Sequence, residues 1–184
     1  MIMEIVYQGK TKTGKEIIIR YPQIGDEKEM WRYINELSKE KTFVRFQGEE
    51  ILFEDEKKYL SSLLKQIEEK KSITLLVFWS EKLVAISGIN MRDKTEKHVG
   101  VFGISVAKGF RGEGIGKVLM ERLFKEAKKA IPQLKIVTLE VYQKNSIAKR
   151  IYEGFGFKEC GLLRNGIMRE NEFEDAILMY KNVR

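Results

Sequence analysis

The sequence is poor in cysteine and proline and has no long apolar run, and each shortage excludes a class of protein. Cys160 is the only cysteine among 184 residues, which excludes an internal disulfide and a cysteine-rich metal site. With two prolines, 43% hydrophobic residues and 33% charged residues, wholesale disorder is not expected. The longest apolar runs, such as ITLLVFW, are too short to cross a bilayer, so we expect no membrane contact.

The N-terminal residues also lack the pattern of a secretion signal, because Glu4 interrupts MIMEIVYQG before an apolar segment of sufficient length forms. A single thiol suits a reducing compartment, so we expect a cytoplasmic protein. The chain is long enough for a substantial core and shows no internal repeat, low-complexity tract or linker. The sequence therefore predicts one domain over residues 1–184.

The net charge is +7, from 34 Lys and Arg residues against 27 Asp and Glu residues. The basic residues are interspersed with acids, as in EEKK and EDEKK, which is typical of a solvated surface. An anionic ligand fits the sign of this charge, and so does loose contact with nucleic acid. Because no RNP, zinc-finger or helix-turn-helix signature is present, we expect no specific nucleic-acid partner.

The first 71 residues predict a hairpin followed by two helices. Short β-branched runs at 3–7 and 16–21 flank KTKTGK and predict two strands joined by a turn. Asp26 is placed to cap a helix to about Lys39. The buried face of this helix is predicted to hold Met30, Tyr33, Ile34 and Leu37. After a loop with exposed aromatic residues at 42–53, a second helix should bury Tyr59, Leu60, Leu63, Leu64 and Ile67, with its charges on a solvated face.

From Ile73 onward the pattern is mainly that of strands. Three apolar runs joined by SEK and RDKTEK predict hairpin-linked strands at 73–79, 83–91 and 99–106. A helix, a strand and a short helix capped by Asn145 should follow at 117–130, 135–142 and 146–153. FKECGLL, a polar turn at 164–172 and FEDAILMYKN complete an α+β order with a mixed sheet. Because a helix lies between them, strands 99–106 and 135–142 should pair in parallel.

A glycine-rich segment, RGEGIG, joins the strand at 99–106 to the following helix. Its glycines leave backbone amides unshielded at the positive end of that helix, which suits an anion such as a pyrophosphate. A dinucleotide-binding fingerprint would need glycine at Lys117. A P-loop would need glycine at Arg111 and serine or threonine at Val118, so neither of these phosphate motifs matches.

The spacing of Arg111, Gly114 and Gly116 resembles the R-x-x-G-x-G acetyl-CoA loop of the GNAT superfamily of N-acetyltransferases. A second segment, LEVYQKNSIAKRIYEGFGF, resembles the other family signature, E-V-x-x-x-N-x-x-A-x-x-x-Y-x-x-x-G-F. The residues that match it are Glu140, Val141, Asn145, Ala148, Tyr152, Gly156 and Phe157. The tail, LRNGIMRENEFEDAILMY, is similar to the C-terminal hairpin of the ribosomal-protein N-acetyltransferase branch. The resemblance covers about residues 73–181.

The resemblance implies an α+β GNAT fold with a mixed, mostly antiparallel sheet and helices on both faces. Strands 99–106 and 135–142 would splay apart around the cosubstrate acetyl-CoA, and no metal is implied. Backbone groups of Ile104, Ser105 and Val106 would hold the pantetheine arm, with the amide of Val106 or of a neighbouring residue near the thioester oxygen. The pyrophosphate would be bound by Arg111, Gly112, Glu113, Gly114, Ile115, Gly116 and Lys117. Asn145 and Ala148 would lie against the pantetheine.

By the same resemblance, Tyr152 would protonate the CoA thiolate and Glu140 would take the amine proton, directly or through water. Each residue also has a structural interpretation: Tyr152 as a half-buried core aromatic, Glu140 as part of the sheet end, and Arg111 as a surface charge. His98 is expected to be exposed. Cys160 is expected to be buried, which argues for direct transfer in a ternary complex rather than through an acyl-cysteine.

The activity implied is N-acetyl transfer to a primary amine. An α-amine, with a pKa of roughly 7.7–8.0 against about 10.4 for lysine, costs some 3–4 kcal/mol less to deprotonate at neutral pH, which favours a protein or peptide N-terminus as acceptor. A small amine, such as a polyamine, an aminoglycoside or an amino-acid analogue, stays an alternative, with an acidic cleft supplied by Glu49, Glu50, Glu54, Asp55 and Glu56. A non-catalytic acetyl-CoA sensor is the alternative from another class. The oligomeric state is open, a homodimer included.

Overall fold

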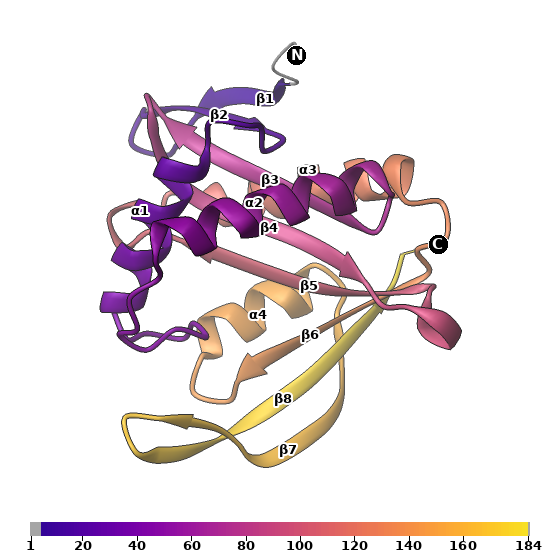
Figure 1. The fold of residues 1–184 in the computed structure, drawn as a ribbon. Coiled ribbons are helices and arrows are strands. Elements are labelled where there is room, and N and C mark those ends of the chain that lie inside the picture. Colours follow the sequence, from indigo (N-terminus) through magenta and orange to yellow (C-terminus); the bar gives the residue numbers. More distant parts are fainter. Residues whose placement is uncertain (1–4, 184) are drawn as a thin grey trace. The chain divides into compact units, whose positions relative to one another are not determined.

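The computed structural model describes residues 5–183, which form eight strands, four α-helices and two short 3-10 helices (Figure 1). The strands are β1 (Ile5–Lys10), β2 (Glu16–Arg20), β3 (Ser72–Trp79), β4 (Lys82–Met91), β5 (Val99–Val106), β6 (Ile136–Tyr142), β7 (Lys158–Arg169) and β8 (Glu172–Asn182). The helices are α1 (Glu27–Lys39), α2 (Phe53–Glu68), α3 (Ile115–Ala130) and α4 (Ser146–Gly154), with η1 (Lys94–Glu96) and η2 (Lys108–Phe110). Within residues 5–183, no helix combines the length and the apolar character needed to span a membrane.

The chain divides into two compact units, and neither is one continuous segment. Unit 1 contains the described residues up to Asn90 together with Gly103–Pro132, and unit 2 contains Met91–Phe102 together with the described residues from Gln133 onward. Strand β5 passes from unit 2 into unit 1 between Phe102 and Gly103. Its two halves therefore belong to different units.

In unit 1, β1 to β4 pair with their neighbours in sequence order, and every pair is antiparallel. The second half of β5 lies beside β4, where the amide of Ala107 donates to the carbonyl of Val84 (2.9 Å) and Ser87 Oγ donates to the carbonyl of Gly103 (2.9 Å). The predicted opening hairpin and the three hairpin-linked strands are confirmed. The predicted start of the first strand, Met3, lies outside the described residues, and β1 continues to Lys10.

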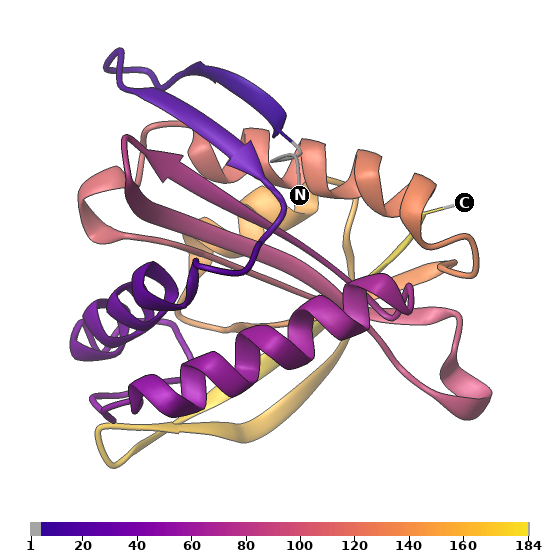
Figure 2. The same ribbon diagram turned by 45° about the horizontal axis from the view of Figure 1, so that its top comes forward.

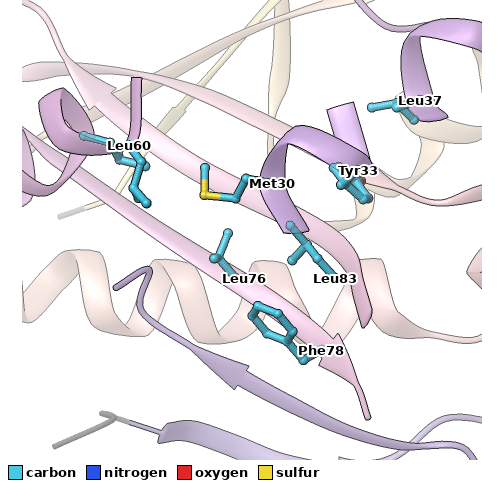
Figure 3. Packing of buried hydrophobic residues seen from close by; sticks show 8 residues of the cluster. Met30, Tyr33, Leu37, Leu60, Leu76, Phe78 and Leu83 are labelled. Carbon is cyan, nitrogen blue, oxygen red and sulfur yellow. The ribbon is translucent and has the colours of Figure 1, made fainter. Parts of the chain in front are cut away.

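Helices cover both faces of the strands in unit 1. Residues of α1 and α2 form one apolar cluster with alternate residues of β3 and with β4: Met30, Tyr33, Leu37, Leu60, Leu63, Leu76, Phe78 and Leu83. Figure 3 labels all of these except Leu63. The intervening residues of β3, Leu75 and Val77, are fully buried on the opposite face, where α3 packs against β3 (Figure 2). Complete burial of each such side chain contributes roughly 1.5–3 kcal/mol, so this two-sided packing is the main source of stability in unit 1.

The capping role predicted for Asp26 is wrong, although α1 does begin at the next residue. The Asp26 carboxylate instead accepts hydrogen bonds from both terminal nitrogens of Arg20 (2.7 and 2.6 Å) and from the amide of Gln23 (2.9 Å). Arg20 is itself buried and lies over the Phe78 ring. A buried guanidinium without a carboxylate would be strongly destabilising, so the ion pair takes precedence over the cap.

The predicted buried face of α2 is right at its centre and wrong at its edge. Leu60 and Leu63 are buried, but Tyr59 is 53% exposed, while Glu56, predicted on the solvated face, is 6% exposed. In the preceding loop, Phe43 and Phe46 are half-buried rather than exposed. The aromatic side chains of this loop thus contribute to packing.

In unit 2, the first half of β5 pairs in parallel with β6 over three residue pairs, from Val99↔Ile136 to Val101↔Thr138. β6 and β7 both pair with β8 in antiparallel fashion, so the strand order is β1-β2-β3-β4-β5-β6-β8-β7. The predicted parallel pair is confirmed, and it is the single parallel pair among the strands of residues 5–183. The α+β class with a mixed, mostly antiparallel sheet is therefore also confirmed.

Two predictions in unit 2 are wrong. The polar turn expected at 164–172 is mostly strand, because β7 runs to Arg169 and only Glu170 and Asn171 form the turn, with φ of 50° and 64°. Two successive positive φ angles are those of a type I′ hairpin turn, which matches the twist of the flanking strands. Cys160, expected to be buried, is exposed on β7, an edge strand with most of its side chains in solvent.

Candidate active site

The glycine-rich loop lies in unit 1, between η2 and α3. Gly112 and Gly114 have φ of +78° and +85°, a region that side chains rarely adopt, and Gly114 is the N-cap residue of α3. Gly116 lies in the first turn of the helix without a positive φ. The α3 helix begins at Ile115, two residues earlier than predicted, so the first-turn amides of a 16-residue helix open onto the loop. This arrangement suits an anion.

Glu113 places a negative charge within this anion-binding sequence, and its contacts account for that charge. Its carboxylate accepts hydrogen bonds from the Thr13 amide (3.1 Å), the Thr13 hydroxyl (2.7 Å) and Lys15 Nζ (2.9 Å). The hydrogen bond from Lys15, followed by those from Thr13, lowers the pKa of Glu113 to about 2. The carboxylate is therefore ionised at neutral pH and bound to the β1–β2 turn.

Arg111 does not extend freely into solvent. Its Nε donates to the carbonyl of Val106 (2.8 Å), and its terminal NH2 donates to Glu40 at the C-terminal end of α1 (2.5 Å). The side chain therefore connects the end of β5 to α1. These contacts do not fit an isolated surface charge, and the predicted role of Arg111 in binding the pyrophosphate stays a prediction.

The strand segment predicted to hold pantetheine, Ile104 to Val106, is half-buried at the C-terminal end of β5. Its Ser105 hydroxyl is 2.9 Å from the hydroxyl of Tyr33, a buried residue of α1. Burial raises the pKa of the Tyr33 hydroxyl above its usual range, so this hydroxyl stays neutral. The hydrogen bond fixes the strand against α1.

Tyr152 lies in unit 2 on α4 and is half-buried. Its ring makes edge-on contacts with Phe102 (5.9 Å between centroids) and Phe157 (6.0 Å). This burial raises the pKa of the Tyr152 hydroxyl to about 12. The aromatic contacts fit the structural interpretation of Tyr152, and they also hold the ring in one orientation while the hydroxyl keeps its proton.

Glu140 and Asn145 lie at the end of β6 and the start of α4. Glu140 is exposed, and its neighbours Leu139 and Val141 are buried on the other face of the strand. Asn145 Oδ1 accepts from the amide of Ala148 (3.2 Å), so its predicted capping role is confirmed. Because the cap uses the carbonyl oxygen, the Asn145 side-chain NH2 group keeps its two donors for another partner.

The predicted site residues are thus divided between the two units. Unit 1 brings together the strand Ile104–Val106 and the loop from Arg111 to Lys117, whereas unit 2 holds Glu140, Asn145, Ala148 and Tyr152. His98 is exposed, as expected. Among residues 5–183, no group of three or more His, Cys, Asp or Glu side chains is arranged to hold a metal ion.

Residues 23–157 match the model of the acetyltransferase (GNAT) family, and this range includes the glycine loop and the segment around Asn145 and Tyr152. The chain belongs to the GNAT family. Its members are acyltransferases that use acetyl-CoA. The family assignment explains both an anion-binding loop that is neither a P-loop nor a dinucleotide fingerprint and the parallel pairing of β5 with β6.

Two solved structures of acetyltransferases are similar to this GNAT chain. The acetyltransferase of the GNAT family from Streptococcus pneumoniae has a crystal structure that superposes with a TM-score of 0.83 and 29% identity, covering 91% of this chain and 99% of that one. A ribosomal L7/L12 alpha-N-protein acetyltransferase in complex with coenzyme A has a TM-score of 0.79 at 10% identity, covering 97% and 98% of the two chains, and so shows the fold alone.

Among curated proteins, the ribosomal protein bS18-alanine N-acetyltransferase of Escherichia coli (strain K12) is 34% identical to this GNAT chain over 79 residues. The match covers 43% of this chain and 52% of that protein. The chain therefore spans about half the length of the curated relatives that it matches, which makes the relationship a distant one.

Three groups of residues around the loop were not identified from the sequence: Tyr33, Glu40, and the turn residues Thr13 and Lys15. Tyr33 fits the apolar pattern of the buried face of α1, and this pattern does not predict a hydrogen bond from its hydroxyl group. Glu40 and the turn are far from the loop in sequence, 71 and about 100 residues away, and no spacing rule links them to it. The run KTKTGK offers one signal, since two threonines and three lysines are more than a hairpin turn needs.

Proposed function

We propose that this GNAT protein is an acetyl-CoA-dependent N-acetyltransferase that transfers acetyl to the α-amine of a protein or peptide, directly and in a ternary complex. The observation that carries the choice of acceptor is the 34% identity over 79 residues to an alanine N-acetyltransferase of a ribosomal protein. The lower cost of deprotonating an α-amine than a lysine side chain supports the same choice.

Donor binding is assigned to the residues of unit 1. Amides from Arg111 to Lys117, at the positive end of α3, would bind the pyrophosphate, with Gly114 providing the left-handed N-cap. The backbone of Ile104 to Val106 would hold the pantetheine arm as an added strand. The Val106 amide would then lie near the thioester oxygen, where it would stabilise the tetrahedral oxyanion.

Tyr152 is assigned the role of proton donor to the departing thiolate. A pKa of about 12 keeps the hydroxyl protonated throughout the physiological range, which a donor requires. A free thiol has a pKa of roughly 8.5, so complete transfer from this phenol is uphill. The physical expectation is therefore a strong hydrogen bond to the developing thiolate, in which burial of both groups strengthens the interaction.

Glu140 is assigned the role of base, through a water molecule, and Asn145 and Ala148 are assigned to the pantetheine. Glu140 is exposed and has no cation partner within residues 5–183, so solvent reaches its carboxylate. The exposed position of Cys160 removes the argument for direct transfer that its predicted burial supplied. Direct transfer is now supported by the match to the family signature alone, and Cys160→Ala tests it, since an acyl-cysteine route would be abolished.

A small-amine acceptor has less support, because the acidic residues proposed to form its cleft are mostly engaged. Glu54 pairs with Lys57 and Asp55 with Lys58 along α2 (3.2 and 3.3 Å), and the Glu49 carboxylate accepts from the amide of Gln47. Such helical pairs leave little uncompensated negative field for a polycation. A non-catalytic acetyl-CoA sensor is the remaining alternative.

The test is a CoA-release assay with acetyl-CoA and four acceptor classes: N-terminal peptides, lysine peptides, polyamines and aminoglycosides. Turnover should be highest with N-terminal peptides, and acetyl-CoA binding without turnover on any acceptor would favour the sensor. Tyr152→Phe should lower kcat by about 10²-fold, with little change in the Kd for acetyl-CoA, since it removes one donor and keeps the ring. Equal rates for the variant and the unmodified protein would contradict the donor role.

Gly116→Trp tests the proposed binding site for acetyl-CoA. An added Cβ at Gly116 meets only Ile104 Cδ1, at 3.9 Å, so a small substitution fits the chain itself. A bulky indole here should block CoA binding, whereas Gly116→Ala should leave the free protein as stable as before or up to about 1 kcal/mol more stable, because alanine favours the helix. Retention of CoA affinity by Gly116→Trp would mean that the loop is not the CoA site.

A further inference from the structure

The β1–β2 turn, residues 11–15, makes a continuous set of contacts with the glycine loop inside unit 1. In addition to the three hydrogen bonds to the Glu113 carboxylate, the amide of Lys12 donates to the backbone carbonyl of Glu113 (3.2 Å). The Lys15 ammonium also lies 4.9 Å from the centre of the Phe110 ring, just before the loop. The turn is therefore attached to the loop through both backbone and side-chain atoms.

Of the two lysines in this turn, only Lys15 forms an ion pair. The charge of Lys15 is compensated by Glu113. Lys12 has no carboxylate partner among the residues that the structure describes, and its stem lies along the loop: a Cβ built on Gly114 would be 3.8 Å from Lys12 Cε and 3.9 Å from Cγ. The Lys12 ammonium is one bond beyond Cε. An exposed, uncompensated cation is thus held next to the N-cap residue of α3.

The position of Lys12 is unfavourable for the free protein and favourable for binding an anion. An uncompensated lysine adjacent to the positive end of a helix is unfavourable in the free protein, because both carry positive potential. The Glu113 contacts nevertheless hold the turn in this position. A phosphate bound at the loop amides would turn the repulsion into a charge-assisted hydrogen bond.

We infer that Lys12 is a further ligand of the phosphate groups of coenzyme A, and that the Glu113 contacts position the β1–β2 turn for this purpose. The inference rests on the proposed function, because it assigns the anion at the loop to CoA. Lys12 binds either the pyrophosphate or the 3′-phosphate of the same molecule. The Glu113 carboxylate acts through the turn and does not itself contact the ligand.

The experiment measures the Kd for CoA by calorimetry with the full-length chain. Lys12→Ala should weaken binding about tenfold at low salt, less at high salt, because it removes one charge-assisted hydrogen bond. Lys12→Arg should bind within a few-fold of the unmodified protein. Lys10→Ala is the matched control: it removes an equal charge from the end of β1, directly before the turn, at a residue that pairs with Glu16 (3.5 Å), and the Kd of this variant should be unchanged.

A comparison of CoA with 3′-dephospho-CoA distinguishes the two phosphate sources. If the Lys12→Ala effect disappears with dephospho-CoA, Lys12 binds the 3′-phosphate; if it persists, Lys12 binds the pyrophosphate. Thr13→Val, which removes the hydroxyl donated to Glu113, should weaken CoA binding by a smaller factor, and it should have no further effect when combined with Lys12→Ala. An additive effect would contradict the positioning role of the turn.

Two results would overturn the assignment of Lys12: an unchanged Kd for Lys12→Ala, or an equal loss for Lys10→Ala, which would indicate a general charge effect. In either case, abolition of CoA binding by Gly116→Trp would leave the proposed function intact. If the unmodified chain itself failed to bind CoA, both the proposed function and the inference would be wrong.

Discussion

At the scale of single residues, the buried Glu56 shows how far a solvated-face pattern can mislead. It lies in the first turn of α2 with 6% of its surface exposed. Burial raises its pKa from 4.5 to about 7. The helix N-terminus favours a negative charge, but here desolvation outweighs that preference.

This shift predicts a stability that falls as the pH rises. Between the unfolded pKa of about 4.5 and the folded pKa of about 7, the folded state holds more protons than the unfolded one, so the free energy of unfolding decreases through that window and is level above it. Glu56→Gln should therefore stabilise the protein at pH 8 by about 2 kcal/mol more than at pH 5. Urea unfolding at the two pH values measures the difference, with the exposed Glu54→Gln as control. An equal effect at both pH values would show that Glu56 titrates normally.

The residues whose roles were predicted correctly are those determined by their own neighbours in sequence. Asn145 caps α4 because its partner, Ala148, is three residues away. Asp26 stands in an equivalent position before α1, but a buried arginine six residues earlier takes its carboxylate. Cys160 was expected to be buried from the apolar run around it, yet an edge strand has no neighbour to bury it. Local patterns do not reveal such partners or their absence.

At the scale of elements, the connection from Arg111 to Glu40 joins α1, the end of β5 and the glycine loop. Its contribution to stability is expected to be small, below about 1 kcal/mol, because the Arg111 side chain is 39% exposed. Its contribution to geometry is larger, since one guanidinium contacts both the Val106 carbonyl and the helix. We therefore expect Arg111 to keep the loop and strand in register for the cofactor.

Arg111→Lys and Glu40→Gln should each weaken CoA binding by a similar few-fold factor, and the double variant should be no worse than either one. Lysine cannot replace a planar group that donates to a carbonyl and a carboxylate at once. If Arg111 bound the pyrophosphate directly, Glu40→Gln would release it and strengthen binding. Calorimetric Kd values for the three variants distinguish the two roles, and the control is Glu36→Gln, in a surface pair with Arg32 on the same helix.

The positions of helices and strands were predicted correctly wherever a change in the spacing of apolar residues marked a boundary. The predicted and observed ranges of β3 and β5 agree within a residue. The length of β7 was underestimated because its second half carries polar side chains on an edge strand. A strand with one buried face carries apolar residues at alternate positions, so a polar segment next to it indicates a turn. A strand with both faces exposed can be polar throughout, and its composition then resembles that of a turn. The two turn residues, Glu170 and Asn171, are identified by their φ angles and not by composition.

At the scale of the whole molecule, the division of the chain bears on the single domain expected from its length. The chain passes between the units three times, after Asn90, Phe102 and Pro132, so that each unit is assembled from separate segments. Strand β5 pairs with β4 at one end and with β6 at the other. Unfolding of either unit removes half of the pairing of this strand, so we propose that the two units unfold together as one domain.

The positions of the natural probes make this proposal testable. Both tryptophans, Trp31 and Trp79, lie in unit 1, and the single cysteine, Cys160, lies exposed in unit 2, where an environment-sensitive dye can be attached. Urea transitions followed by tryptophan fluorescence, by the dye and by far-UV circular dichroism should share one midpoint, as cooperative unfolding requires. Labelled and unlabelled chains must agree in the tryptophan signal to exclude an effect of the dye. Separate midpoints for the two probes would instead mean that the glycine loop and Tyr152 belong to independently folding units.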